Sequence, residues 1–101
     1  MPSNLEFLPS AKKEWDKLGS TIRRQFEKKL KERLELPRVA SAALRGIPDH
    51  YKIKLRQLGY RLVYCVNDGT VIVLVVAVGK RERGGVDTAA RERRDGRQPS
   101  E

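Results

Sequence analysis

Residues 51–66 read YKIKLRQLGYRLVYCV, and this stretch decides the fold. Apolar and cationic side chains alternate from Tyr51 to Arg56, so a strand here has one apolar face and one cationic face. Leu58-Gly59 marks a turn, and a second alternating stretch follows from Tyr60 to Val66. The pattern predicts two paired antiparallel strands.

The neighbouring segments supply the other strands of a sheet. Asn67-Asp68-Gly69 is a strong hairpin turn signal. Residues 71–78 after it are apolar at every position, which is typical of a central strand covered on both faces. Residues 5–8 predict a short first strand that ends at Pro9.

Two helices are expected between the first strand and the hairpin. Ile22, Phe26, Leu30 and Leu34 recur every four residues and define the second helix, which Pro37 ends. Trp15 and the residues around it define a shorter helix before Gly19. The order β-α-α-β-β-β predicts an α+β domain with a small antiparallel β-sheet and an N-terminal helical hairpin packed on one face.

The chain is long enough for one domain. Its 101 residues predict a single domain over 1–94, with a weak helix at 86–94 and a disordered tail at 95–101. The start of the sequence has no basic segment followed by an apolar one, and no apolar run is long enough to span a bilayer. A cytoplasmic protein without a membrane segment is expected.

Positive charge is concentrated in the middle of the chain. The 22 Lys and Arg residues exceed the 13 Asp and Glu by nine, and residues 37–65 hold six basic residues and one acidic residue, Asp49. Such a one-sign segment indicates an anionic partner. Protection of an exposed sheet edge by Lys and Arg explains it about as well.

Common catalytic and metal-binding motifs are missing from the sequence. One cysteine, Cys65, and one histidine, His50, cannot form an intramolecular disulfide or an all-His/Cys zinc site. No phosphate-binding loop, CxxC or HExxH motif occurs. We therefore expect no cofactor and no metal.

Lysine and arginine suffice for one reaction class, the cleavage of RNA by attack of the 2′-OH on the adjacent phosphate. Guanidinium groups stabilise the negative charge that develops on the phosphate, and a lysine crowded by other cations loses its proton more readily. Lys52 and Lys54 lie on one strand face, with Arg61 on the next strand and Arg81 just past the central strand. The spacing alone is weak evidence, because many RNA-binding strands look the same.

Five motifs together resemble the RelE family of bacterial toxins, in order and without obvious gaps between about residues 5 and 86. They are residues 14–21 (EWDKLGST), 44–49 (LRGIPD), 51–56 (YKIKLR), 59–64 (GYRLVY) and 78–83 (VGKRER). The resemblance implies the microbial-RNase-like RelE fold and a type II toxin that cleaves mRNA in the ribosomal A site. It also implies a RelB-like antitoxin as partner, with operator DNA bound only through the toxin–antitoxin complex.

The resemblance also assigns roles to residues of this sequence. Lys54, helped by Lys52, would activate the 2′-OH. Arg61 and Arg81 would hold the phosphate in the transition state, and Arg81 is a candidate for protonating the leaving oxygen. Three further arginines would contact the substrate: Arg45, Arg56 and Arg83.

One position departs from the family pattern. Counted from the GKRER motif, Asp87 stands where the family has a tyrosine that stacks on an mRNA base. An aspartate cannot stack and would repel phosphates, so cleavage is expected to be weaker, unless another aromatic is used or the C-terminal helix directs Asp87 away from the RNA.

The sequence is also compatible with two functions other than mRNA cleavage. One is a non-enzymatic ParE-like toxin that inhibits DNA gyrase, which would not need the four catalytic candidates together. The other is a catalytically weakened RelE homologue that only binds RNA or the ribosome, with salt-sensitive affinity.

Overall fold

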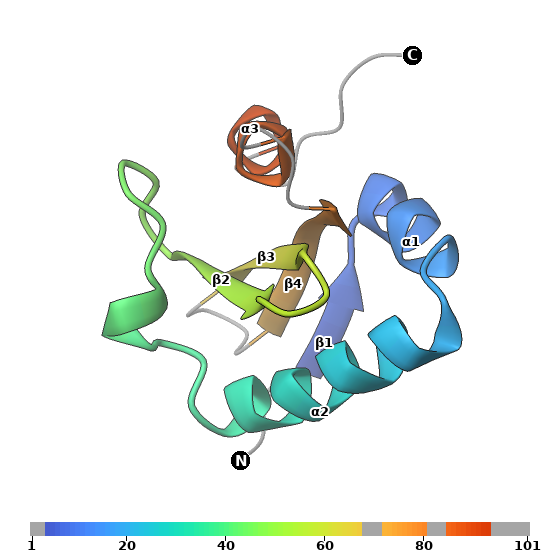
Figure 1. Cartoon of the computed structure of the whole chain (residues 1–101). Coiled ribbons are helices and arrows are strands. Elements are labelled where there is room, and N and C mark those ends of the chain that lie inside the picture. Colours follow the sequence, from blue (N-terminus) through green and yellow to red (C-terminus); the bar gives the residue numbers. More distant parts are fainter. Residues whose placement is uncertain (1–3, 68–71, 81–84, 94–101) are drawn as a thin grey trace.

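The computed structural model describes residues 4–67, 72–80 and 85–93. Four strands, three α-helices and a short 3-10 turn follow one another along the chain (Figure 1). In order they are β1 (Asn4–Phe7), α1 (Pro9–Asp16), α2 (Ser20–Glu35), η1 (Ala40–Ala42), β2 (His50–Leu55), β3 (Tyr60–Asn67), β4 (Ile72–Lys80) and α3 (Gly85–Glu92). The predicted α+β class and element order are confirmed, and α3 covers most of the weak helix expected at 86–94.

The four strands form one sheet in the order β1-β4-β3-β2. β2 pairs antiparallel with β3, and β3 pairs antiparallel with β4. β1 pairs parallel with β4, from Asn4 opposite Ile72 to Phe7 opposite Val75. The sheet is therefore mixed, and the expectation of a wholly antiparallel sheet is wrong in this detail. The apolar strand β4 is central, as its composition predicts.

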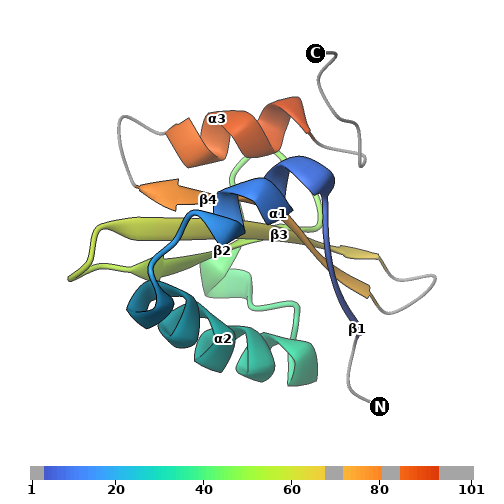
Figure 2. The same ribbon diagram turned by 90° about the vertical axis from the view of Figure 1, so that its right-hand side faces the viewer.

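The helices surround the sheet on three sides. Figure 2 shows α2 below the sheet, α3 above it and α1 in front of its edge. α1 and α2 contact each other through Trp15 and Phe26, which belong to one hydrophobic core, as expected for the predicted helical hairpin. α1 follows β1 directly and lies beside the part of β4 that β1 is too short to pair, where Glu14 Oε1 accepts a hydrogen bond from the Val78 N–H (3.3 Å).

The main core lies between α2 and the sheet. Phe26 and Leu30 of α2 are buried, as are Ile53, Leu62 and Tyr64 of the strands. An aromatic cluster extends this core to α1, because the Trp15 ring lies 5.3 Å from the Phe7 ring and 6.2 Å from the Phe26 ring, between centroids. The predicted assignment of Trp15 and Phe26 to the core is confirmed.

The β2–β3 turn is the predicted one. Gly59 adopts a φ of 73°, in the left-handed region that side-chain-bearing residues rarely adopt. The predicted turn at residues 68 and 69 and the predicted disordered tail at 95–101 lie outside the described residues. Among the helices that are described, none combines the length and the apolar character that a membrane span needs.

Candidate active site

Three of the four predicted catalytic residues lie on one face of the sheet. Lys54 of β2 is directly opposite Arg61 of β3, and Lys52 is directly opposite Val63. Residues opposite each other in antiparallel strands share a face with Cα atoms about 4.5–5.5 Å apart, and residues two apart on a strand lie roughly 6.6 Å apart. Lys52, Lys54 and Arg61 therefore form one cluster, which we call the cationic face.

The members of the cationic face differ in their exposure. Lys52 and Lys54 are half-buried on the edge strand β2, whereas Arg61 retains only 9% of its accessible surface. Arg61 pairs on its other side with Gly79 of β4, and a Cβ atom at Gly79 would lie 3.8 Å from Val86 of α3. A guanidinium held in such a partly desolvated place interacts more strongly with an incoming anion than one in bulk water does.

β2 is held from the opposite side of the sheet by a residue that the sequence did not single out. Arg33 Nη1 of α2 donates hydrogen bonds to the Lys52 carbonyl oxygen (3.3 Å) and to the Tyr64 hydroxyl (2.9 Å). The Tyr64 hydroxyl donates in turn to the Pro37 carbonyl oxygen (2.7 Å). Burial raises the pKa of the Tyr64 hydroxyl, an effect that the neighbouring Arg33 guanidinium opposes. This network ties α2 to the strand that bears both lysines.

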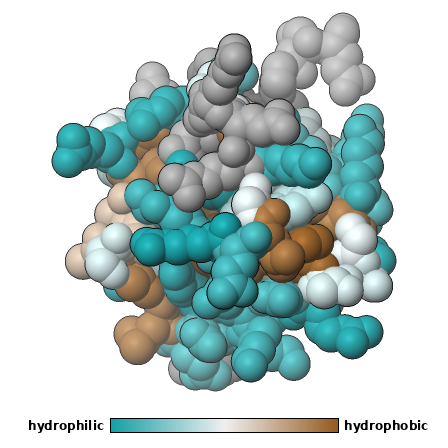
Figure 3. Space-filling view, in the orientation of Figure 1, coloured by the Kyte–Doolittle hydropathy of each residue, from teal (hydrophilic) through white to brown (hydrophobic). Residues whose placement is uncertain are grey.

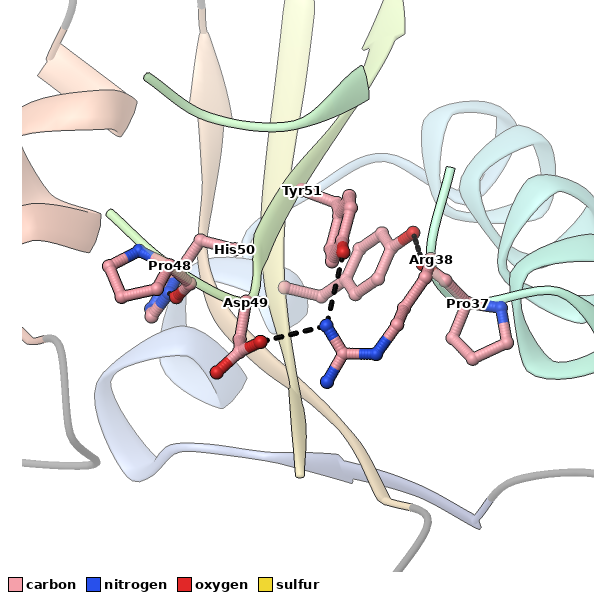
Figure 4. Close-up of polar contacts among 7 residues, drawn as sticks. Pro37, Arg38, Pro48, Asp49, His50 and Tyr51 are labelled. Carbon is pink, nitrogen blue, oxygen red and sulfur yellow. Dashed lines mark hydrogen bonds and ion pairs between the residues drawn. The ribbon is translucent and has the colours of Figure 1, made fainter. Parts of the chain in front are cut away.

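The acidic residue of the basic segment lies at the other end of β2. Figure 4 shows the Arg38 guanidinium between Asp49 and Tyr51. Its Nη1 lies 2.7 Å from Asp49 Oδ1 and 3.2 Å from the Tyr51 hydroxyl. Asp49 precedes β2, whereas Lys54 is near the end of β2. The carboxylate is thus paired with an arginine at a distance from the Lys54–Arg61 pair.

His50 lies beside this end of β2 and is buried. Its Nδ1 donates a hydrogen bond to the Pro48 carbonyl oxygen (2.9 Å). It is directly opposite Cys65 on β3, on the same face as Lys52. Among the described residues, no three His, Cys, Asp or Glu side chains gather as a metal site would require.

The predicted substrate-binding arginines are spread more widely. Arg45 is exposed in the turn before β2, at the His50 end. Arg56 is exposed just past the Lys54 end of the same strand. Arg81 and Arg83 lie outside the described residues. Asp87 belongs to α3, and its side chain is likewise not described.

An ion pair that the sequence analysis also missed joins the end of α3 to α1. Arg93, just past α3, makes two hydrogen bonds to the Glu14 carboxylate of α1 (2.9 and 3.2 Å). It donates a third to the Val76 carbonyl oxygen (2.9 Å), at a register shift between β3 and β4. Arg93 and Glu14 are 79 positions apart in the sequence, so no local sequence pattern indicates their contact.

The other explanation for the positive charge also agrees with the topology. β2 is an edge strand of the sheet. Lys52 and Lys54 on such a strand also discourage pairing with another chain. Edge protection accounts for the lysines of β2, but it does not account for a buried arginine on the inner strand β3.

Comparisons with known proteins identify the family. A model of the ParE toxins of type II toxin–antitoxin systems (parDE) matches residues 5–85. The mRNA interferase toxin RelE of Escherichia coli (strain K12) is 58% identical over 89 residues, which cover 88% of this chain and 94% of that protein. This chain belongs to the RelE toxin family. The resemblance found in the five sequence motifs is confirmed.

Solved RelE structures agree with the fold described above. The free state of a double arginine-to-alanine variant of E. coli RelE superimposes with a TM-score of 0.86 and 54% identity, covering 93% of this chain and 99% of that one. A variant of E. coli RelE in complex with a peptide of the antitoxin, RelBc, gives a TM-score of 0.79 at 56% identity, covering 89% of this chain and 95% of that one. The family fold is thus present over the cationic face as well as the core.

Proposed function

We propose that this chain is an mRNA interferase toxin, a metal-independent endoribonuclease that cleaves mRNA in the ribosomal A site and thereby inhibits translation. The observation that carries the proposal is the placement of Lys54 directly opposite Arg61, with Lys52 on the same face. The relatives support it, since proteins 58% identical to this chain are mRNA interferases.

The reaction we propose forms one bond at phosphorus and breaks another. Lys54 in its neutral form, assisted by Lys52, takes the proton of the 2′-OH, whose oxygen then attacks the adjacent phosphate. The bond to the 5′ oxygen of the next nucleotide breaks, and Arg81 donates a proton to this leaving oxygen. Arg61 and Arg81 stabilise the additional negative charge on the phosphate in the transition state.

The ribosome would supply what the cationic face lacks. Lysines and arginines bind a phosphate but do not orient a base, and Asp87 stands where the family has a stacking tyrosine. Bound mRNA in the A site would already be held in a conformation suited to in-line attack, which lowers the entropic cost of the reaction. Arg45, Arg56 and Arg83 would contact the mRNA or the ribosomal RNA around it.

The proposed partners follow from the same family membership. A RelB-like antitoxin would bind the toxin, since a RelE relative is solved with an antitoxin peptide. Operator DNA would be bound only through that complex. The site of action would be the cytoplasm, where translating ribosomes are found.

The test is a translation assay with matched lysine variants. Purified wild-type protein is added to a reconstituted translation system, and mRNA ends are mapped by primer extension. We expect cuts within A-site codons, a loss of about 100-fold or more in Lys54→Ala, and full cleavage in the control Lys17→Ala, whose side chain is exposed at the end of α1. Wild-type protein that leaves mRNA intact but inhibits DNA supercoiling by gyrase would support the ParE-like alternative instead.

A further inference from the structure

Beyond the cationic face, the surface has two adjoining grooves lined by basic residues. The first, of about 450 Å³, lies between α2 and the β2–β3 turn and is lined by Lys54 and Arg56 on one side and by Gln25 and Lys29 on the other. The second runs along the exposed side of α2 and is lined by Arg24, Lys28 and again Gln25 and Lys29. Gln25 and Lys29 line both grooves, so the two grooves lie next to each other.

The grooves begin at the cationic face. Lys54 belongs to both the cationic face and the first groove, because β2 is the edge strand. Both ribbon views place the β2–β3 turn close to α2 (Figures 1 and 2). A chain that passes Lys54 can therefore turn around the sheet edge past Arg56 and reach Lys29 on α2.

The charge of the lining is strongly one-sided. Five cationic side chains face a single carboxylate, that of Glu32; they are Arg24, Lys28, Lys29, Lys54 and Arg56. Four of the five are exposed, and Lys54 is half-buried. Side chains four apart on a helix, such as Arg24 and Lys28, lie about 5–6 Å from each other, which suits successive contacts along a polyanion. Hydrophilic side chains also dominate the lower part of the surface in Figure 3.

We propose that these grooves form a binding track for the single-stranded RNA that flanks the scissile phosphate, with Arg56, Lys29, Lys28 and Arg24 contacting successive backbone phosphates. The inference rests on the proposed function. An acidic protein segment would also be attracted to this charge. RNA is favoured because the track starts at the residue assigned to 2′-OH activation, so a bound strand has to continue into one of the spaces beside it.

The track is tested by binding to RNA that cannot be cleaved. 2′-O-methyl RNA lacks the attacking hydroxyl, so its affinity is measured independently of catalysis. A trimer reaches only the cationic face, whereas a decamer also reaches the track. For single strands, the logarithm of the binding constant falls by about 0.7 per decade of salt for each phosphate contact.

The variant Lys28→Gln/Lys29→Gln removes two cations from the track while keeping residues that favour a helix. We expect the decamer to bind about tenfold more weakly and the trimer to bind as it does to the wild type. The slope of log binding constant against log salt concentration for the decamer should become shallower by about 1.4, since two phosphate contacts are lost. The control Lys17→Gln/Lys31→Gln removes two exposed cations outside both grooves and should leave the binding of both RNAs within about twofold of the wild type.

Two outcomes would overturn the track. In the first, the double variant binds the decamer as the wild type does, with or without a loss of binding to a RelBc-type antitoxin peptide. In the second, it weakens the binding of the trimer and the decamer equally. Failure of the proposed function would look different, since a protein without nuclease activity can still bind the decamer more tightly than the trimer through this track.

Discussion

The hydroxyl of Tyr64 joins three parts of the fold, and its removal should destabilise the protein markedly. Tyr64 is fully buried; its hydroxyl donates to Pro37 O (2.7 Å) and accepts from Arg33 Nη1 (2.9 Å). A neutral hydrogen bond contributes about 0.5–1.5 kcal/mol and one to a charged group about 1.5–3 kcal/mol. We therefore expect Tyr64→Phe to lower the free energy of unfolding by about 2–4 kcal/mol, because both hydrogen bonds are lost. No cavity is created, so no packing loss adds to this value.

Thermal unfolding followed by circular dichroism measures this effect. At about 4–8 °C per kcal/mol for a domain of this size, a loss of about 2–4 kcal/mol should lower Tm by roughly 8–32 °C. Tyr60→Phe is the matched control, because Tyr60 lies on the same strand and is only partly buried; its Tm should change little. If Tyr64→Phe unfolds within about 2 °C of the wild type, the hydroxyl does not connect α2, the loop after it and the sheet in the way described.

A double-mutant cycle separates the two bonds. Arg33→Met keeps the length of the side chain and removes its donors, so the cycle with Tyr64→Phe gives the coupling between Arg33 and Tyr64. We expect about 1–2 kcal/mol. Arg33→Met should also speed amide hydrogen exchange in β2 more than in β4, because Arg33 contacts the Lys52 carbonyl oxygen. Equal effects on both strands would refute a specific role in holding β2.

Three further predictions concern pH, the attachment of α3 and position 87. Burial raises the pKa of the Tyr64 hydroxyl in the folded state above its unfolded value of about 10. The stability that the protonated hydroxyl contributes is therefore complete below about pH 10 and is lost as the pH rises through the folded pKa. Above about pH 10, the unfolding free energy of the wild type should fall more steeply than that of Tyr64→Phe. Glu14→Gln should lower the free energy of unfolding by about 1–3 kcal/mol in urea titrations, because Arg93, whose side chain is 12% exposed, loses its ionic partner; an unchanged midpoint would show that the pair does not hold α3. Asp87→Tyr should raise the rate of mRNA cleavage in the translation assay. A lower rate would show that a tyrosine at position 87 does not assist cleavage in this protein as it does in the family.

Sequence patterns predicted the elements better than their arrangement. The two-residue period of β2 and the four-residue period of α2 report directly on which side chains are buried, and both were correct. The parallel pairing of β1 was missed, although a strand as apolar as β4 needs two neighbours and only β1 remained to be the second. The position of α1 at the sheet edge depends on how short β1 is, and the hydrophobic pattern of the sequence gives no information about this.

The candidate site shows the same division. Alternation alone placed Lys52 and Lys54 on one face, and the hairpin turn at Gly59 set Arg61 opposite Lys54. Arg33 and Arg93 could not be found in this way, because charged residues on or beside helices are usually solvated and their contacts here span 17 to 79 positions. The roles assigned to the cationic face depend on chemistry that neither periodicity nor fold determines.

The most direct test of the central claim is the chemistry of the cut ends. mRNA recovered from a translation reaction with the wild-type protein is analysed for its new termini. Attack by the 2′-OH predicts a 2′,3′-cyclic phosphate on the upstream fragment and a 5′-OH on the downstream one, both absent with Lys54→Ala. Fragments that end in 3′-OH and 5′-phosphate, or the same cyclic ends at an undiminished rate from Lys54→Ala, would contradict RNA cleavage by the cationic face.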